Sequence, residues 1–144
     1  MIKQELLGAV FIDSQGWMAL MNLKDQSHHD ARRVYDQIIE KRLYLYTTNW
    51  TAYEALSHIR EREKGGGLNP ARKLQAILGM KNAVTVVTVT ADLEERAIQR
   101  FWRYEDKPWS VVLCASHEVM SDLGLRYVLS ANKGFAQAGF VNLI

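Results

Sequence analysis

Short apolar runs, rich in β-branched and aromatic residues, alternate along this chain with longer stretches in which apolar residues recur every three or four positions. The short runs have the length of strands, and the longer periodic stretches are typical of amphipathic helices. This alternation predicts an α/β fold, a three-layer sandwich with a central parallel β-sheet. The expected strands are Val10–Asp13, Leu43–Thr47, Val84–Val89, Tyr127–Ser130 and Phe140–Leu143.

Capping residues predict where the helices of the first half begin. Ser27, with Asp30 three residues later, is typical of a helix N-terminus, and Thr48 or Asn49 can cap the helix after the second strand. The latter helix is expected to run to about Lys64 and to end at the three glycines 65–67.

Three more helices are expected in the second half of the chain. Asn69-Pro70 starts a short basic helix, and Thr90 caps a helix whose acidic first turn suits the helix dipole. Asp106 and Pro108 are expected to begin the last long helix, and Gly124 to end it.

Size and composition fit an ordinary globular protein. The 144 residues are enough for one domain with a proper core, and we expect a single domain over residues 1–144. The net charge of +2 permits nucleic-acid binding without arguing for it. The lone cysteine, Cys114, excludes an internal disulfide, and no apolar run approaches the roughly 18 residues of a membrane span. A cytoplasmic protein without a membrane partner is therefore expected.

Polar residues follow the expected strands at places that meet on one edge of a parallel sheet. Asp13 ends the first strand, Asn132 follows the fourth, and Glu54 lies one to two turns into the helix after the second. Groups at the carboxyl ends of central strands converge on a crevice where ligands bind. The alternatives are that Asp13 only caps a helix beginning at Ser14, and that Glu54 is a solvated helical acid.

The order of the motifs resembles the PIN-domain ribonucleases, and most closely the VapC-type toxins of toxin–antitoxin pairs. The resemblance runs from Phe11 to Phe140 and implies the PIN fold and a metal-dependent endoribonuclease. In that family an Asp, a Glu and two further Asp residues hold Mg²⁺ or Mn²⁺. The stretches that carry the resemblance are residues 9–17, 47–54, 106–114 and 129–140.

Two of the four family positions hold other residues in this sequence. By the resemblance, Asp13 and Glu54 are the remaining catalytic and metal-binding carboxylates, whereas Leu113 and Asn132 stand where the family has Asp. Leucine cannot bind a metal and asparagine offers one neutral oxygen, so we expect Mg²⁺ or Mn²⁺ to bind weakly or not at all. Two hypotheses follow: a VapC-like ribonuclease with weak activity, and an inactive PIN fold that binds RNA or protein.

A basic pair of helices is the second feature to which the resemblance gives a role. In the family such a pair borders the RNA groove and meets an antitoxin or a second subunit, so the implied partners are RNA, an antitoxin-like protein and a second copy of the chain. The alternative is that these helices only face solvent and are balanced by Glu61 and Glu63. The basic residues are Arg60, Arg62, Lys64, Arg72 and Lys73.

Other conspicuous side chains near the expected site are predicted to be structural. His58 and His117 lie one helical turn after Glu54 and Leu113, but imidazole favours transition metals over Mg²⁺, so packing or exposure is expected. We expect core or rim packing for Trp17 and Trp109, with base stacking as the alternative, and a buried, inert Cys114.

Overall fold

The computed structural model describes residues 8–62 and 68–144. Each strand that the sequence predicts is present, with bounds within two residues of those expected. Along the chain the elements are β1 (Ala9–Ile12), α1 (Ser14–Met21), α2 (His28–Glu40), β2 (Tyr44–Thr48), α3 (Asn49–Glu61), α4 (Leu68–Gly79), β3 (Thr85–Val87), α5 (Ala91–Arg103), α6 (Val111–Leu123), β4 (Tyr127–Leu129), α7 (Lys133–Gln137) and β5 (Val141–Asn142).

The strands form one five-stranded sheet in the order β3-β2-β1-β4-β5, and every neighbouring pair is parallel. The central strand is β1, in which Phe11 lies opposite Tyr46 of β2 and Val128 of β4. Val10, Phe11 and Ile12 are completely buried, as expected for a strand covered on both faces. The predicted central parallel sheet is confirmed.

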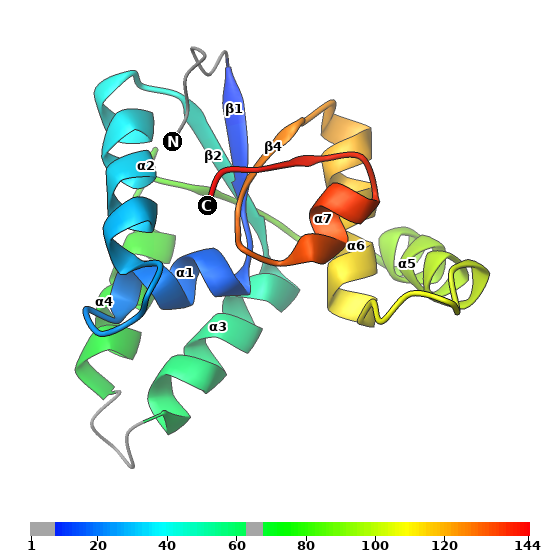
Figure 1. Cartoon of the computed structure of the whole chain (residues 1–144), viewed down its shortest axis with the longest axis horizontal. Helices are drawn as coiled ribbons and strands as arrows, with labels where there is room; N and C mark the ends of the chain where they lie inside the picture. Colours follow the sequence, from blue (N-terminus) through cyan, green and yellow to red (C-terminus); the bar gives the residue numbers. More distant parts are fainter. Residues whose placement is uncertain (1–7, 63–67) are drawn as a thin grey trace.

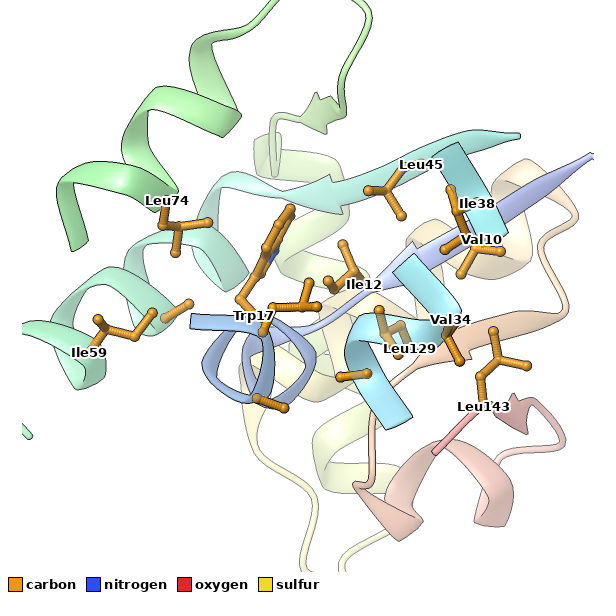
Figure 2. Close-up of a cluster of buried hydrophobic side chains, with 14 residues drawn as sticks. Val10, Ile12, Trp17, Val34, Ile38, Leu45, Ile59, Leu74, Leu129 and Leu143 are labelled. Atoms are coloured by element: carbon orange, nitrogen blue, oxygen red, sulfur yellow. The ribbon is translucent and has the colours of Figure 1, made fainter. Parts of the chain in front are cut away.

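Helices cover both faces of the sheet (Figure 1). Because successive strand side chains point to opposite faces, Val10 and Ile12 pack with α1 to α4, whereas Phe11 packs with α5 to α7. Figure 2 shows the first of these cores, in which Trp17 of α1 lies between Leu74 of α4 and the sheet. The molecule therefore has two separate apolar cores, one on each side of β1.

Several helix ends lie where the capping residues predicted them. The Thr48 hydroxyl accepts a hydrogen bond from the Thr51 amide at 3.0 Å, and the Thr90 hydroxyl accepts one from the Leu93 amide at 3.3 Å. Gly124 ends α6 with a left-handed backbone, φ 68°, which glycine adopts at little cost. None of the helices in the described ranges is both long and apolar enough to cross a bilayer.

One predicted helix start is wrong, and at a second helix, which begins where predicted, the expected side-chain cap is not formed. The helix α6 begins at Val111 and not at Asp106 or Pro108, because residues 104–107 form a turn closed by the Lys107 amide and the Tyr104 carbonyl. Its cap is Ser110, whose hydroxyl accepts from the Leu113 amide at 3.0 Å. Ser27 precedes α2 but makes no side-chain cap, since its φ of −90° and ψ of 0° lie outside the extended region in which caps form.

The two serines allow a matched test of this difference. Ser110→Ala should lower the free energy of unfolding by about 0.5–2 kcal/mol, the usual cost of losing an N-cap. Ser27→Ala should change it by much less, because no cap bond is lost there. Urea unfolding of both variants measures the difference, and equal losses would contradict the assignment of a cap bond to Ser110 and of none to Ser27.

Candidate active site

The Asp13 carboxyl lies at the end of the central strand and is 5% exposed. Its backbone is extended, and its Oδ1 accepts a hydrogen bond from the Gly16 amide at 3.1 Å, which caps α1. A Cβ built at Gly16 would overlap the Leu129 carbonyl oxygen, so only glycine lets α1 pass this close to β4. Asp13 is therefore a helix cap, and it also stands at the predicted crevice.

The surroundings of Asp13 favour its neutral form. Burial raises the pKa of its carboxyl from 3.8 to about 7, because the charged form loses its water. Hydrogen bonds from the Gly16 amide and the Ser130 hydroxyl partly offset this effect, while the negative charge of Glu54 adds to it. At neutral pH a carboxyl with this pKa is protonated in a large share of the protein molecules.

Glu54 reaches the same place from α3. It is half-buried, and its Oε1 accepts a hydrogen bond from the Ser14 hydroxyl at 2.5 Å. Ser14 directly follows Asp13, so this bond fixes the second carboxylate beside the first. The structure thus brings Asp13 and Glu54 together at the carboxyl edge of the sheet.

Leu113 lies in the first turn of α6, is 6% exposed and belongs to the second core. It packs against Gly134 of α7 so closely that a Cβ built at Gly134 would overlap the Leu113 Cδ2. The same Cβ would lie 3.3 Å from Cδ1 of Trp109. Leu113 thus forms an apolar contact between α6 and α7.

Asn132 is the N-cap of α7, and its side-chain oxygen is used locally. Its Oδ1 accepts a hydrogen bond from the Gly134 backbone amide at 2.9 Å. Its backbone amide donates one to the Ser130 hydroxyl, also at 2.9 Å. The Asn142 side-chain amide holds the same loop by donating to the carbonyls of Ser130 and Asn132, at 2.8 and 3.0 Å. Ser130 therefore connects Asn132 to Asp13.

These groups do not fit a tightly held divalent cation. In the described part of the chain, nowhere do three or more His, Cys, Asp or Glu side chains gather as a metal would require. Of the two carboxylates at the crevice, one caps a helix and the other accepts from Ser14. Hard cations are held by several oxygens, whereas Leu113 supplies a hydrocarbon and Asn132 an amide oxygen that already caps α7.

His117 is a packing residue, as predicted. Its ring is completely buried and lies against the rings of Trp109, Phe135 and Phe140, with Nε2 3.1 Å from the Gly134 carbonyl oxygen. Burial lowers its pKa to about 4, and the positive charge of Arg100 acts in the same direction. His117 therefore stays neutral near pH 7 and can donate its Nε2 hydrogen to α7.

The remaining predictions of structural roles also hold. Trp17 is fully buried in the first core, Trp109 is buried against α7, and His58 is exposed. Cys114 is buried, and burial raises the pKa of its thiol to about 11, so it is not a reactive thiolate. No sequence pattern predicts the hydrogen bond that Trp109 Nε1 donates to Gln137 Oε1, 2.8 Å long, which joins the segment before α6 to α7.

The basic residues of α3 and α4 divide between two surfaces. Arg60 and Arg72 line one pocket of about 270 Å³ between the two helices, whereas Arg62 lines a different pocket near the crevice. Lys73 is exposed on α4, and Lys64 lies outside the described residues. Within residues 8–62 and 68–144, none of these four described residues forms an ion pair with a carboxylate.

Comparison with known proteins extends over nearly the whole chain, although no protein-family model matches it. It is 29% identical over 134 residues to "23S rRNA-specific endonuclease VapC20" of Mycobacterium tuberculosis, covering 93% of this chain and 97% of that protein. The crystal structure of VapC20 from that organism, described as a Sarcin-Ricin loop cleaving toxin, matches with a TM-score of 0.81 and 30% identity over 92% of this chain and 96% of that one.

A more distant structure has the same fold. FitAcB from Neisseria gonorrhoeae matches with a TM-score of 0.62 at 12% identity, covering 92% of this chain and 94% of that one. With the parallel sheet and the placement of Asp13 and Glu54 at its carboxyl edge, the similarity to VapC20 identifies the class. The chain belongs to the VapC-type PIN-domain ribonuclease toxins, as the order of its motifs predicted.

The raised pKa of Asp13 predicts a pH-dependent stability. The folded state binds the proton more tightly than the unfolded state, so this group stabilises the protein at low pH and the stabilisation is lost as pH rises from about 4 through 7. Between pH 5 and pH 8 the wild type should lose roughly 2–3 kcal/mol more than Asp13→Asn, which keeps a capping oxygen.

Urea unfolding of both proteins at the two pH values measures this effect. The contribution of His117 has the opposite sign, since its pKa is lowered, and it cancels in the comparison between the two proteins. Parallel pH profiles would mean that Asp13 ionises normally in the folded protein.

The contact between Leu113 and Gly134 predicts a size constraint. Gly134→Ala should destabilise the protein by about 1–3 kcal/mol, because the new methyl group overlaps Leu113. Gly79→Ala is the matched control, since a Cβ at that helical position meets nothing within 4 Å. In a Leu113→Ala background most of the cost should vanish, and a double-mutant cycle that finds the two changes additive would exclude the contact.

Proposed function

We propose that this chain is an RNA-directed VapC-type toxin whose endoribonuclease activity is weak. The observation that carries the proposal is the pairing of Asp13 with Glu54, through Ser14, at the carboxyl edge of a VapC-like sheet. The weakness follows from the other two positions, since Leu113 is packed into the core and Asn132 caps α7. Activity is thus expected to be limited by charge and not by the fold.

RNA is the proposed substrate class. VapC20, a relative of similar length, is named for cleavage of 23S rRNA, and its structure is described as that of a Sarcin-Ricin loop cleaving toxin. In this chain Arg60 and Arg72 offer guanidinium groups between α3 and α4, and Arg62 offers one at a separate pocket. Arginine suits phosphate because its planar group donates two parallel hydrogen bonds. Binding should therefore weaken steeply as salt is raised.

The further proposals on partners and metal follow from the family. VapC-type toxins pair with an antitoxin, and the groove between α3 and α4, with Arg60 and Arg72 on its walls, is our proposed contact for such a protein. We also propose a homodimer and a cytoplasmic protein. Mg²⁺ or Mn²⁺ is the family cofactor. The two carboxylates of this chain attract such a cation only weakly.

The alternative function is that of an inactive PIN fold that binds RNA or protein. The observation in its favour is the apolar contact of Leu113 with Gly134, where the family holds a carboxylate. The two functions differ in whether adding the missing charges creates a nuclease.

Repair of the acidic site is the corresponding experiment. Leu113→Asp combined with Asn132→Asp should produce Mn²⁺ binding in a calorimetric titration and raise cleavage of RNA, whereas the wild type should give little heat at the same concentrations. Each single change should do less, because the carboxylates act through one shared ion. The repaired protein without metal should be less stable and should recover on adding Mn²⁺, which binds only the folded state.

Adding Asp13→Asn to the repaired protein is the control, and it should remove the gained cleavage. A repaired protein that folds but neither binds Mn²⁺ nor cuts RNA would favour the binding function. Strong Mn²⁺ binding by the unmodified chain would contradict the proposed weakness of the site.

A further inference from the structure

One pocket is lined by residues that neighbour Asp13 and Asn132 along the chain. Its volume is about 260 Å³, and its walls come from α1, the loop between α1 and α2, the end of α3 and the loop after β4. The residues that matter for its chemistry are Gln15, Met18, Asp25, Ser27, Arg62 and Ala131.

Two chain segments connect this pocket to the crevice. Gln15 is two residues after Asp13, so the two Cα atoms lie within about 7 Å of each other, and Ala131 directly precedes Asn132. Both Gln15 and Ala131 are exposed. A strand of nucleic acid with one phosphate at the carboxylates can therefore reach the pocket with a neighbouring nucleotide.

The lining of the pocket has the composition of a site for a flat heterocycle. Met18 and Ala131 offer apolar surface, and methionine adapts to the shape of what it contacts. The Gln15 amide both donates and accepts. The Asp25 Oδ1 accepts from the Ser27 amide at 2.8 Å, which holds the loop and leaves the second carboxylate oxygen for an N–H donor. Apolar walls with a few converging polar groups are typical of ligand pockets.

The size and charge of the pocket further restrict the class of ligand that it can bind. Its volume is below the roughly 300–1,000 Å³ of pockets for drug-sized molecules, so it suits a single ring system. Arg62 adds a guanidinium group that makes no ion pair with any carboxylate of the described residues. A planar heterocycle next to a phosphate is the chemistry of a nucleotide.

We propose that this pocket binds one unpaired nucleobase of the RNA substrate, beside the nucleotide whose phosphate faces Asp13 and Glu54. The proposal rests on RNA being the substrate class. Bases of unpaired RNA are recognised by stacking and by hydrogen bonds to their edges, whereas a paired base is not free to enter. The pocket thus selects for a loop or bulge over a continuous duplex.

The direct test uses ¹⁵N-labelled protein titrated with AMP, GMP, CMP and UMP in the presence of EDTA. At least one nucleotide should shift the Gln15 side-chain amide and the backbone amides of Ser27 and Ala131 in a saturable way. Ribose 5-phosphate, which lacks the base, should not do so. Shifts confined to the pocket of Arg60 and Arg72, or equal shifts with ribose 5-phosphate, would overturn the proposal.

Variants then connect the pocket to RNA. Ala131→Leu should block the pocket and lower the affinity for a hairpin RNA with an unpaired loop by about tenfold, which corresponds to about 1.4 kcal/mol of lost base contacts. Gln15→Ala, which removes only the polar contact, should weaken binding less, and Gln99→Ala on exposed α5 is the matched control. None of the variants should alter the weaker binding of a fully paired duplex.

The two proposals fail in different ways. If the protein binds nucleotides at Gln15 but never cuts RNA, the pocket proposal stands and the proposed nuclease activity is contradicted. If the protein cuts hairpin RNA, and the Ala131→Leu and Gln15→Ala variants bind this RNA as tightly as the wild type, the nuclease proposal stands and the pocket proposal is contradicted.

Discussion

The Asp13 carboxyl ends a strand that is buried on both faces, and it is satisfied by groups that neighbouring elements bring to it. Gly16 of α1 donates to it, the Ser130 hydroxyl after β4 lies within hydrogen-bonding reach, and Ser14 ties Glu54 of α3 beside it. Since an unsatisfied buried carboxyl is costly, α1, the loop after β4 and α3 are all fixed by this one group. Its ionisation is suppressed as a result, so the same packing that builds the crevice also limits the charge available there.

The surroundings of the four motif positions fall into two unlike halves. The half formed by β1, α1 and α3 keeps both acids and its polar contacts, whereas the half formed by α6 and α7 is held by apolar packing of Leu113 on Gly134 and by the bonds of His117 and Trp109 to α7. The halves are anchored in different cores, on opposite faces of the sheet. A change in the packing of one half can therefore leave the geometry of the other intact.

Sequence patterns were sufficient for the sheet, because a buried parallel strand such as Val10–Ile12 is marked by its own apolar residues. They also located Asp13 and Glu54, which follow strands whose ends must meet. The short helix α7 was not predicted, since its five residues carry no helical period. The start of α6 was predicted too early in the chain, because Pro108 resembles a helix start. The fit of Gly134 to Leu113, 21 positions apart, exists only in three dimensions.

The apolar contact at Leu113 also makes this position costly for a charged side chain. Burial of one leucine side chain stabilises a fold by about 1.5–3 kcal/mol, which is a large part of the margin by which a protein stays folded. Leu113→Asp alone removes that stabilisation. It also buries a charge while no second new acid is present to share a cation. The stability of the fold alone therefore favours leucine over aspartate at this position, whatever the effect of the residue on catalysis.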